Sequence, residues 1–356
     1  MTAAETMARA PSARFDFDAY VTAIAFGGPR GAVAAFALGD GTVRIVDTRA
    51  PREPVRVSEA HRGAVLAMAP LADGSGFLTG GDDGRLVRVG AAGESTALAS
   101  FGIHWVGHIA AAHDRILCAV GRESVLLGLD GRRLASRAHP STVEGVYIDA
   151  RSKRIAVGHY DGVTIWSGAN PDQQSRLLRW KGAHFSVTLS PDNRYVVSAM
   201  QENALHGWRL SDGAHFRMTD YDAKIRSFGW TRAGRYLATA GAQTVLCWPF
   251  FHKDGPMGRL PLELGMPAGP LVKVVAPHAS CNVVASGYDN GHVILFRLDD
   301  DGWIPIAFGG RSPVSALAWS PDGTALAYGT ESGEAALVDL SRSPMLDAGL
   351  RSPKPR

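Results

Sequence analysis

The sequence predicts an all-β propeller of eight four-stranded blades, with seven blades as the second choice. A turn residue followed by a short apolar strand recurs eight times, and the copies are 37 to 48 residues apart, a spacing typical of propeller blades. The 356 residues are 46% hydrophobic and include 41 glycines, which suits buried strands joined by many tight turns. The aligned final positions of the copies are 46, 89, 129, 166, 208, 248, 296 and 338.

The copy over residues 184–218 shows the four strands expected in each blade. It begins with alternating polar and apolar residues, and a Ser-Pro-Asp-Asn turn follows. Residues 194–200 are apolar almost throughout, which predicts a strand buried on both faces. Two further turns lead to strands at 205–210 and 215–218, the last of which is the most polar. Polarity therefore rises toward the outer strand.

The other copies begin with a comparable inner strand. A single four-stranded sheet exposes two apolar faces, so it is stable only when it packs on neighbouring sheets. Closing the sheets into a ring gives every sheet two neighbours and protects its edges. The expected inner strands are 21–26, 65–69, 106–111, 143–148, 225–230, 271–276 and 314–319.

The two ends of the chain complete each other in this scheme. The last copy has only three strands, which end at residues 338–340, and the alternating stretch 13–18 has no blade of its own. We therefore expect residues 13–18 to form the outer strand of the last blade, the alternative being a flexible leader. The predicted organisation is a flexible leader at 1–12, a single propeller at 13–342 and a disordered tail at 343–356.

These residues resemble the WD40-repeat family, and the resemblance covers roughly 13–342. In that family, His, Ser or Thr, Asp and Trp of one repeat form a buried hydrogen-bond chain. No copy here has the full set. The nearest is the fourth, with His139, Asp161 and Trp166, but it has Ala156 or Gly158 where the family has Ser or Thr. We therefore expect apolar packing to replace the chain in most copies. The matching residues are His61 and His139; Asp40, Asp83 and Asp161; Trp166, Trp208 and Trp248; and Asp47, Asp130 and Asp339.

Charge, cysteine content and the absence of long apolar runs limit the kinds of protein that this sequence can encode. A net charge of +3 does not by itself indicate a nucleic-acid-binding protein. Three scattered cysteines without C-x-x-C spacing favour reduced, buried thiols and a cytoplasmic location. We find neither a signal-peptide pattern nor an apolar run long enough to span a membrane. Abundant arginine and alanine suggest a bacterial origin.

Common catalytic and cofactor-binding signatures are absent from the sequence. There is no nucleophile elbow, phosphate-binding loop, dinucleotide fingerprint or H-E-x-x-H motif. His104 and His108 are four residues apart, about 13 Å along a strand, which is too far for two ligands of one zinc ion. Glu144 is the one carboxylate on an expected inner strand, and a metal site or an acid–base pair needs more than one group. We therefore expect a non-enzymatic protein without cofactor or metal.

The loops that enter the inner strands, together with the second turn of each blade, should form the binding face, as the resemblance implies. These loops carry aromatic residues and arginine, the residue types that contribute most to interface energy. Packing of Trp105 or Phe185 onto a neighbouring blade is the alternative. The basic members favour an acidic peptide as partner. The candidate partner-binding residues are Arg62, Trp105, Tyr160, Phe185, Lys224, Tyr288 and Arg311.

A second feature of interest is the long insertion that begins at Phe250-Phe251. The pair of rings either marks a second contact site or anchors the loop to its blade.

The sequence thus predicts a monomeric protein–protein interaction scaffold. The first alternative is a propeller enzyme or metal-binding protein that acts at the central channel. The second is a protein that binds nucleic acid or a small ligand on a basic rim.

Overall fold

The computed structural model describes residues 11–149, 151, 153–265, 268–300, 302–310 and 312–349. The chain divides into two compact units, which we describe separately. The first unit is residues 25–220, and the second combines residues 1–24 with residues 221–356. The described residues form thirty strands, two short 3-10 turns and one α-helix of six residues. The predicted all-β class is therefore confirmed.

The first unit contains antiparallel sheets whose strands follow the order of the chain, and β2 (Val21–Gly27) spans the division between the two units. One sheet has the order β2-β3-β4-β5, and two others are β6 to β9 and β10 to β13. The bounds are β3 (Val33–Leu38), β4 (Thr42–Asp47), β5 (Arg56–Glu59), β6 (Val65–Pro70), β7 (Gly76–Gly81), β8 (Arg85–Gly90), β9 (Ser95–Ser100), β10 (Val106–Ala111), β11 (Arg115–Val120), β12 (Glu123–Gly128) and β13 (Arg133–Ala138).

The fourth and fifth copies share one six-stranded sheet, ordered β14-β15-β16-β17-β18-β19. The described residues therefore form seven sheets. The expectation of eight separate blades is wrong, and the second choice of seven is observed. The reason is that β15 and β16 are each 14 residues long. The first half of each strand pairs with the preceding strand, and the second half pairs with the following strand. The bounds are β14 (Gly145–Ile148), β15 (Arg154–Ser167), β16 (Arg176–Leu189), β17 (Tyr195–Met200), β18 (Leu205–Arg209) and β19 (His215–Met218).

The second unit contains three further four-stranded sheets. Two follow the chain order, β20 to β23 and β24 to β27, and the third has the order β1-β30-β29-β28. The bounds are β1 (Ala13–Asp16), β20 (Phe228–Trp230), β21 (Tyr236–Thr239), β22 (Val245–Pro249), β23 (Leu262–Leu264), β24 (Val272–Pro277), β25 (Val283–Tyr288), β26 (Val293–Arg297), β27 (Trp303–Ala307), β28 (Val314–Trp319), β29 (Ala325–Thr330) and β30 (Glu334–Asp339).

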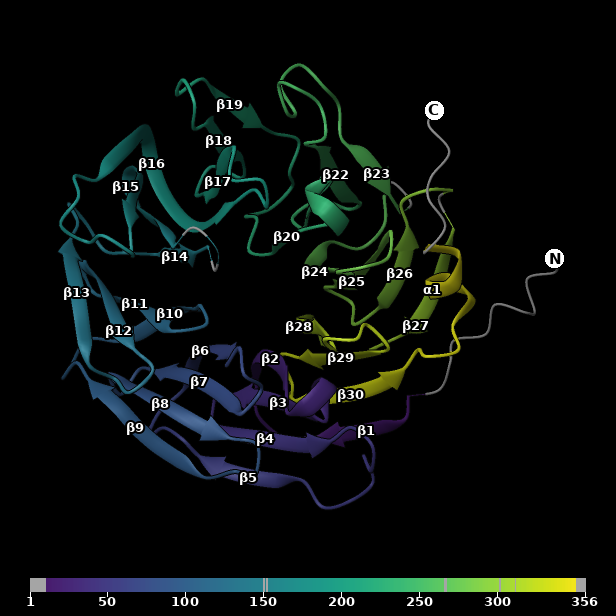
Figure 1. The fold of residues 1–356 in the computed structure, drawn as a ribbon. Coiled ribbons are helices and arrows are strands. Elements are labelled where there is room, and N and C mark those ends of the chain that lie inside the picture. The colour runs from purple at the N-terminus through teal and green to yellow at the C-terminus, as the bar shows by residue number, and fades with distance from the viewer. Residues whose placement is uncertain are drawn as a thin grey trace. The chain divides into compact units, whose positions relative to one another are not determined.

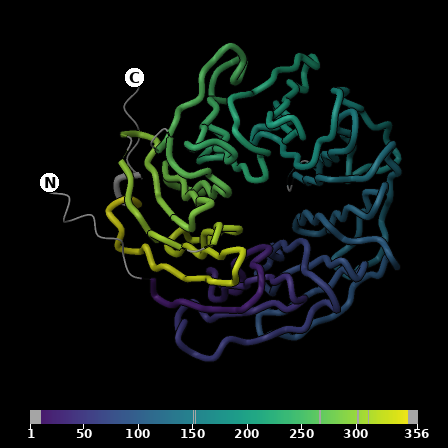
Figure 2. The backbone as a smooth tube through the Cα atoms, turned by 180° about the vertical axis from the view of Figure 1, so that it is seen from behind, coloured from purple at the N-terminus to yellow at the C-terminus, as the bar shows by residue number. Residues whose placement is uncertain are grey.

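The N-terminal strand completes the last sheet, as the sequence predicted. β1 pairs antiparallel with β30 from Ala13 opposite Leu337 to Asp16 opposite Glu334, and Figure 1 and Figure 2 show the two strands side by side. The Ser12 N–H extends this ladder by donating to the Leu337 carbonyl at 2.8 Å. The first residue of β2 also rests on this sheet, because the Ser315 hydroxyl donates to the Val21 carbonyl at 2.7 Å.

The C-terminal tail departs from the expectation of disorder over residues 343–356. Pro344–Gly349 form the helix α1, and Met345 is buried in the core of the last two sheets. The Cys281 thiol contacts the Leu346 carbonyl at 3.6 Å. The apolar pair Met345-Leu346 thus holds the first part of the tail on the sheets. The leader residues 1–10 and the tail residues 350–356 lie outside the described residues.

The second strand of each repeat lies in the core. All six positions of β3, β7, β17 and β25 are buried, which confirms the reading of continuous apolar runs as strands covered on both faces. The three cysteines are buried thiols outside any disulfide, as predicted. Burial raises the pKa of the Cys118 thiol to about 12, so this thiol stays protonated at neutral pH.

Deletion of residues 1–19 should destabilise the protein strongly, because it removes β1 and leaves β30 as an open edge. We expect the free energy of unfolding to fall by at least about 2 kcal/mol, from lost ladder hydrogen bonds and from exposure of apolar surface. Thermal melting followed by circular dichroism measures the change. A deletion of residues 1–10 is the matched control, since it retains Ser12 and β1. Equal melting temperatures for the two deletions would contradict a role for β1.

Candidate partner-binding surface

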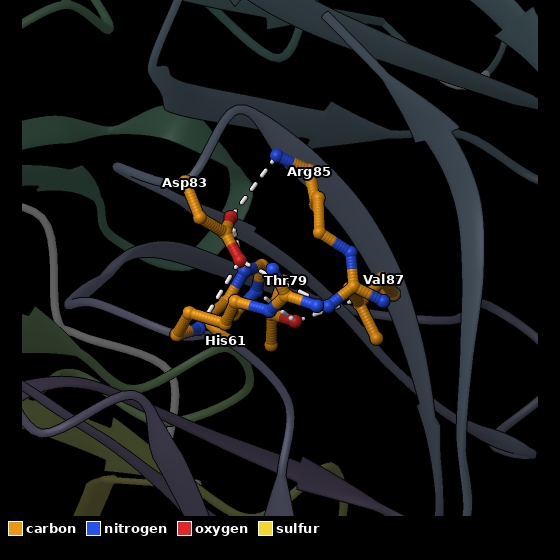
Figure 3. Close-up of polar contacts among 6 residues, drawn as sticks. His61, Thr79, Asp83, Arg85 and Val87 are labelled. Carbon is orange, nitrogen blue, oxygen red and sulfur yellow. Dashed lines mark hydrogen bonds and ion pairs between the residues drawn. The ribbon is translucent and has the colours of Figure 1, made fainter. Parts of the chain in front are cut away.

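A buried polar network holds the loop that precedes β6 against its sheet (Figure 3). His61 Nδ1 lies 2.9 Å from the Asp83 carboxylate, and His61 Nε2 lies 2.9 Å from the Thr79 hydroxyl. Thr79 in turn donates to the Val87 carbonyl on β8 at 3.3 Å. Asp83 also accepts the backbone N–H groups of Arg62 and Arg85. Burial opposes ionisation of Asp83, but these hydrogen bonds outweigh it and lower the pKa of this carboxyl.

A second network of the same form lies in the sheet β20 to β23. The Trp248 indole N–H donates to the Tyr221 hydroxyl at 2.8 Å, and this hydroxyl lies 2.9 Å from the Thr239 hydroxyl. Thr239 donates to the Leu246 carbonyl at 2.9 Å. Tyr221 is buried in the position that His61 holds in its own sheet.

The fourth copy does not hold the most complete chain, contrary to the sequence-based expectation. His139 bonds back to the Ser124 hydroxyl of the preceding sheet at 2.9 Å. Its Nδ1 and the Trp166 Nε1 have no hydrogen-bond partner among the described residues. Thr79 and Thr239 were missed in the sequence. The available signal was spacing, because each follows its ring partner, His61 or Tyr221, by 18 residues.

His206 shows a buried ring without such partners. It is fully buried, and neither ring nitrogen has a hydrogen-bond partner among the described residues. It stacks on Trp180 at 3.9 Å between ring centroids and meets Trp208 edge-on at 4.6 Å. Burial lowers its pKa to about 3, with further lowering from the nearby His215, His184 and Arg217. The ring is therefore neutral at physiological pH.

In the first unit, large apolar side chains reach the surface mainly at one place. The loop between β9 and β10 turns at Gly102, whose φ is +65°, and its Phe101 packs against the core. Ile103 and Trp105 then point outward, 90% and 63% exposed. Trp105 therefore does not pack onto a neighbouring sheet, and the alternative considered for it is wrong.

A hollow of about 490 Å³ lies beside these two side chains. It exists because the ladder between β10 and β11 skips one residue, and this residue is Gly107. A Cβ at Gly107 would have no atom within 4 Å. The residues skipped at equivalent bulges of other inner strands carry side chains: Leu66, Phe185, Lys273 and Ser315. The hollow is lined by Ile103, His104, Trp105, Gly107, His108, Ala119, Gly121, Thr142, Val143 and Glu144.

Tyr160 extends this region. It is 53% exposed, and its backbone N–H donates to the Ser141 hydroxyl at 2.8 Å, next to the lining residue Thr142. We call Ile103, Trp105, Tyr160 and the adjoining hollow the Trp105 surface. Of the four large hydrophobic residues exposed in the described part of the first unit, three belong to it. Such clustering is typical of a contact surface.

The other predicted site residues have different surroundings. Arg62 and Lys224 are exposed, and Phe185 is half-buried at its bulge. Tyr288 is only 3% exposed and packs in the core of its sheet, so the expectation that it projects from a loop is wrong. It is the last residue of β25, and its side chain lies between this sheet and the sheet that contains β23. Arg311 lies outside the described residues.

The two rings of the Phe250-Phe251 insertion have different surroundings, one suited to an anchor for the loop and one to a contact site. Phe250 is buried edge-on against Trp230, with ring centroids 4.8 Å apart, and anchors the loop. Phe251 is half-exposed beneath the Arg235 guanidinium, which lies 4.9 Å from the ring centroid.

Two family models match the chain. One, described as "WD domain, G-beta repeat", matches residues 52–87, the segment that holds His61, Thr79 and Asp83. The other, described as "Anaphase-promoting complex subunit 4 WD40 domain", matches residues 279–349. Together with the sheets described above, these two matches support the WD40-repeat family for this chain. Its blades are the four-stranded sheets and the merged six-stranded sheet described above.

Individual relatives of this WD40 chain are distant. Over 168 residues it is 23% identical to transcription initiation factor TFIID subunit 5 of Caenorhabditis elegans. That match covers 47% of this chain and 25% of the relative, so the chain spans about a quarter of that protein's length. The crystal structure of the computationally designed Ika8 protein is similar, with a TM-score of 0.73 at 17% identity. This match covers 91% of the WD40 chain and 97% of Ika8, and it shows the fold alone.

The described residues contain no cluster of three or more His, Cys, Asp or Glu side chains that could bind a metal ion. Within the same residues, no helix has the length and apolar character needed to cross a membrane.

Substitution of Thr79 with Val tests the network of Figure 3, because it keeps the side-chain shape but leaves His61 Nε2 without its partner. We expect the free energy of unfolding to fall by about 1–3 kcal/mol. Thr96→Val on the exposed side of β9 is the matched control and should change it by less than about 0.5 kcal/mol. Urea denaturation measures both. Equal losses in the two variants would argue against the buried hydrogen bond.

His206 should make stability depend on pH. Its pKa in the folded protein, about 3, lies below its ordinary value of 6.5, so the unfolded chain binds the proton more readily. The stabilisation is complete above pH 6.5 and is lost as pH falls toward 3, at about 1.4 kcal/mol per pH unit. His206→Phe should flatten this part of the profile in denaturation at several pH values. The exposed His113→Phe is the control, and an equal slope in both variants would contradict the assignment.

Proposed function

We propose that this WD40 chain is a non-enzymatic scaffold that binds a partner protein through the Trp105 surface. The observation that supports this most directly is the pair Ile103 and Trp105, exposed together beside a hollow of about 490 Å³. A solvent-exposed indole beside a concave, largely apolar site fits the central anchor of an interface. The backbone below it is held by the ladder between β10 and β11, so little conformational freedom is lost on binding.

The partner we propose is a peptide segment that inserts an apolar side chain into the hollow. Its flanking residues should include an acidic one, because Arg62 and Arg122 are exposed in the same unit and Arg122 follows the lining residue Gly121. Glu144, half-buried in the wall, disfavours a carboxylate inside the hollow itself. The acidic residue should therefore lie beside the anchor.

Membership of a multi-subunit assembly is consistent with this role. The relative from Caenorhabditis elegans is by name a subunit of TFIID, and the second family model is named for a subunit of another complex. We propose the same kind of role here, with the chain monomeric when free. A cytoplasmic location and a bacterial origin remain predictions from composition and cysteine content.

The test is affinity capture from the native cell, followed by mass spectrometry, with two variants of the Trp105 surface. Trp105→Ala removes the exposed indole. Gly107→Leu fills the hollow with the side chain that Leu66 carries at the equivalent bulge, and Gly107 has no positive φ that would oppose it. Each should reduce recovery of the specific partner at least about tenfold, which corresponds to about 1.4 kcal/mol of binding free energy.

Leu260→Ser is the control, because Leu260 is 85% exposed in the second unit and lies outside the Trp105 surface. All three variants should melt at the wild-type temperature. Undiminished capture by both Trp105→Ala and Gly107→Leu would overturn the assignment of this surface. Arg62→Glu tests the charge of the partner, since it should weaken capture of an acidic segment and strengthen capture of a basic one.

A further inference from the structure

A second hollow, of about 450 Å³, lies between two neighbouring sheets of the second unit and shares no residue with the Trp105 surface. One wall is formed by β23 and the turn before β22. The other wall is formed by β26, β27 and the turns beside them. The lining residues are Gln243, Glu263, Leu264, Gly265, Gly269, Pro270, Tyr288, His292, Ile294, Phe296, Trp303 and Phe308.

Four aromatic rings line this hollow at two depths. Tyr288 and Phe296 are buried and form its floor. Phe296 on β26 pairs directly with Trp303 on β27, so both side chains lie on the same face of the sheet. Trp303 and Phe308 are 48% and 59% exposed at the mouth. Phe308 is held edge-on against the His292 ring, with centroids 5.1 Å apart.

The space in front of the floor is open because residue 265 is glycine. A Cβ at Gly265 would lie 3.6 Å from the Tyr288 hydroxyl and 3.7 Å from Phe296 Cζ. Gly265 has a φ of +121°, a conformation that other residues rarely adopt, so the backbone turn itself favours the absence of a side chain here. A ligand can therefore approach both rings.

The charge of the hollow is negative. Glu263 projects from β23 into the lining, and the Thr244 hydroxyl donates to its carboxylate at 3.4 Å. The described lining residues include no Lys or Arg. The other side-chain oxygen acceptor on this wall, Gln243 Oε1, already accepts the Ala268 N–H at 2.8 Å. The hollow thus offers aromatic faces and one carboxylate.

We propose that this hollow binds a quaternary ammonium group. Such a group spreads its positive charge over methyl groups, which pack against aromatic faces and need no hydrogen-bond acceptor. A primary ammonium, by contrast, is strongly hydrated and has three donors to satisfy, and one carboxylate cannot replace that hydration. The Glu263 carboxylate supplies the complementary charge at the wall. The same head group occurs in free choline-type compounds and in a trimethylated lysine side chain.

The test titrates the full-length protein with choline, by isothermal calorimetry and by the change in total tryptophan fluorescence. Binding should be saturable. The neutral isostere in which a tert-butyl group replaces the trimethylammonium group, and ethanolamine with its primary ammonium, should each bind at least roughly fivefold more weakly. A trimethyllysine peptide that displaces choline more effectively than its unmethylated form would identify a protein as the source of the head group. Failure of the peptide to displace bound choline would identify a small molecule.

Two variants locate the site. Trp303→Ala removes a ring at the mouth, and Glu263→Gln removes the charge from an exposed position with little risk to folding. Each should raise the Kd for choline roughly fivefold to tenfold. Phe251→Ala is the control, a half-exposed ring of the same unit outside the hollow, and should leave the Kd within about twofold. Equal binding of the tert-butyl isostere, unchanged Kd values in both variants, or the absence of saturable choline binding would each overturn the proposal.

Discussion

Burial on both faces of every sheet is the constraint on which the rest of this structure depends. The second strands β3, β7, β17 and β25 expose no residue to solvent, so a sheet that lost its neighbours would present two apolar faces to water. The last sheet faces this problem most sharply, because its own segment supplies only three strands. β1 supplies the fourth from the other end of the chain, and Val21 then joins the same sheet through Ser315. Each sheet is therefore stable only when it packs against its neighbouring sheets.

Within this apolar frame, buried polar groups fix the loops where the frame alone would leave them free. His61 and Tyr221 do this with different chemistry. The imidazole uses two nitrogens to join Asp83 and Thr79, whereas the phenol uses one oxygen to join Trp248 and Thr239. Each network is useful because its members are satisfied. His206 is the contrasting case. Its fully buried ring has no hydrogen-bond partner within the described part of the chain, and such a ring stays in its neutral form.

Repeat spacing in the sequence was sufficient to predict the strands, the order of the sheets and the N-terminal strand on β30. It did not predict that β15 and β16 continue from one copy into the next, because a strand that turns without leaving its ladder looks like two strands in sequence. The site was predicted less well. Position in a loop correctly suggested exposure for Trp105 and Tyr160 but failed for Tyr288. The direction of a loop side chain depends on the polar or apolar residues that pack around it, and these residues come from distant parts of the chain.

The same arrangement of strands lets surface side chains differ without loss of the buried core. At the bulges of the inner strands, Leu66, Phe185, Lys273 and Ser315 each present a side chain, and only Gly107 among these five leaves a hollow. In the second unit, the missing side chain of Gly265 leaves space beside Tyr288 and Phe296. Both hollows are bordered by rings that the core does not need, Trp105 in one and Trp303 in the other. A frame whose stability comes from the second strands can therefore vary these rings without unfolding, which makes the surface free to acquire binding specificity.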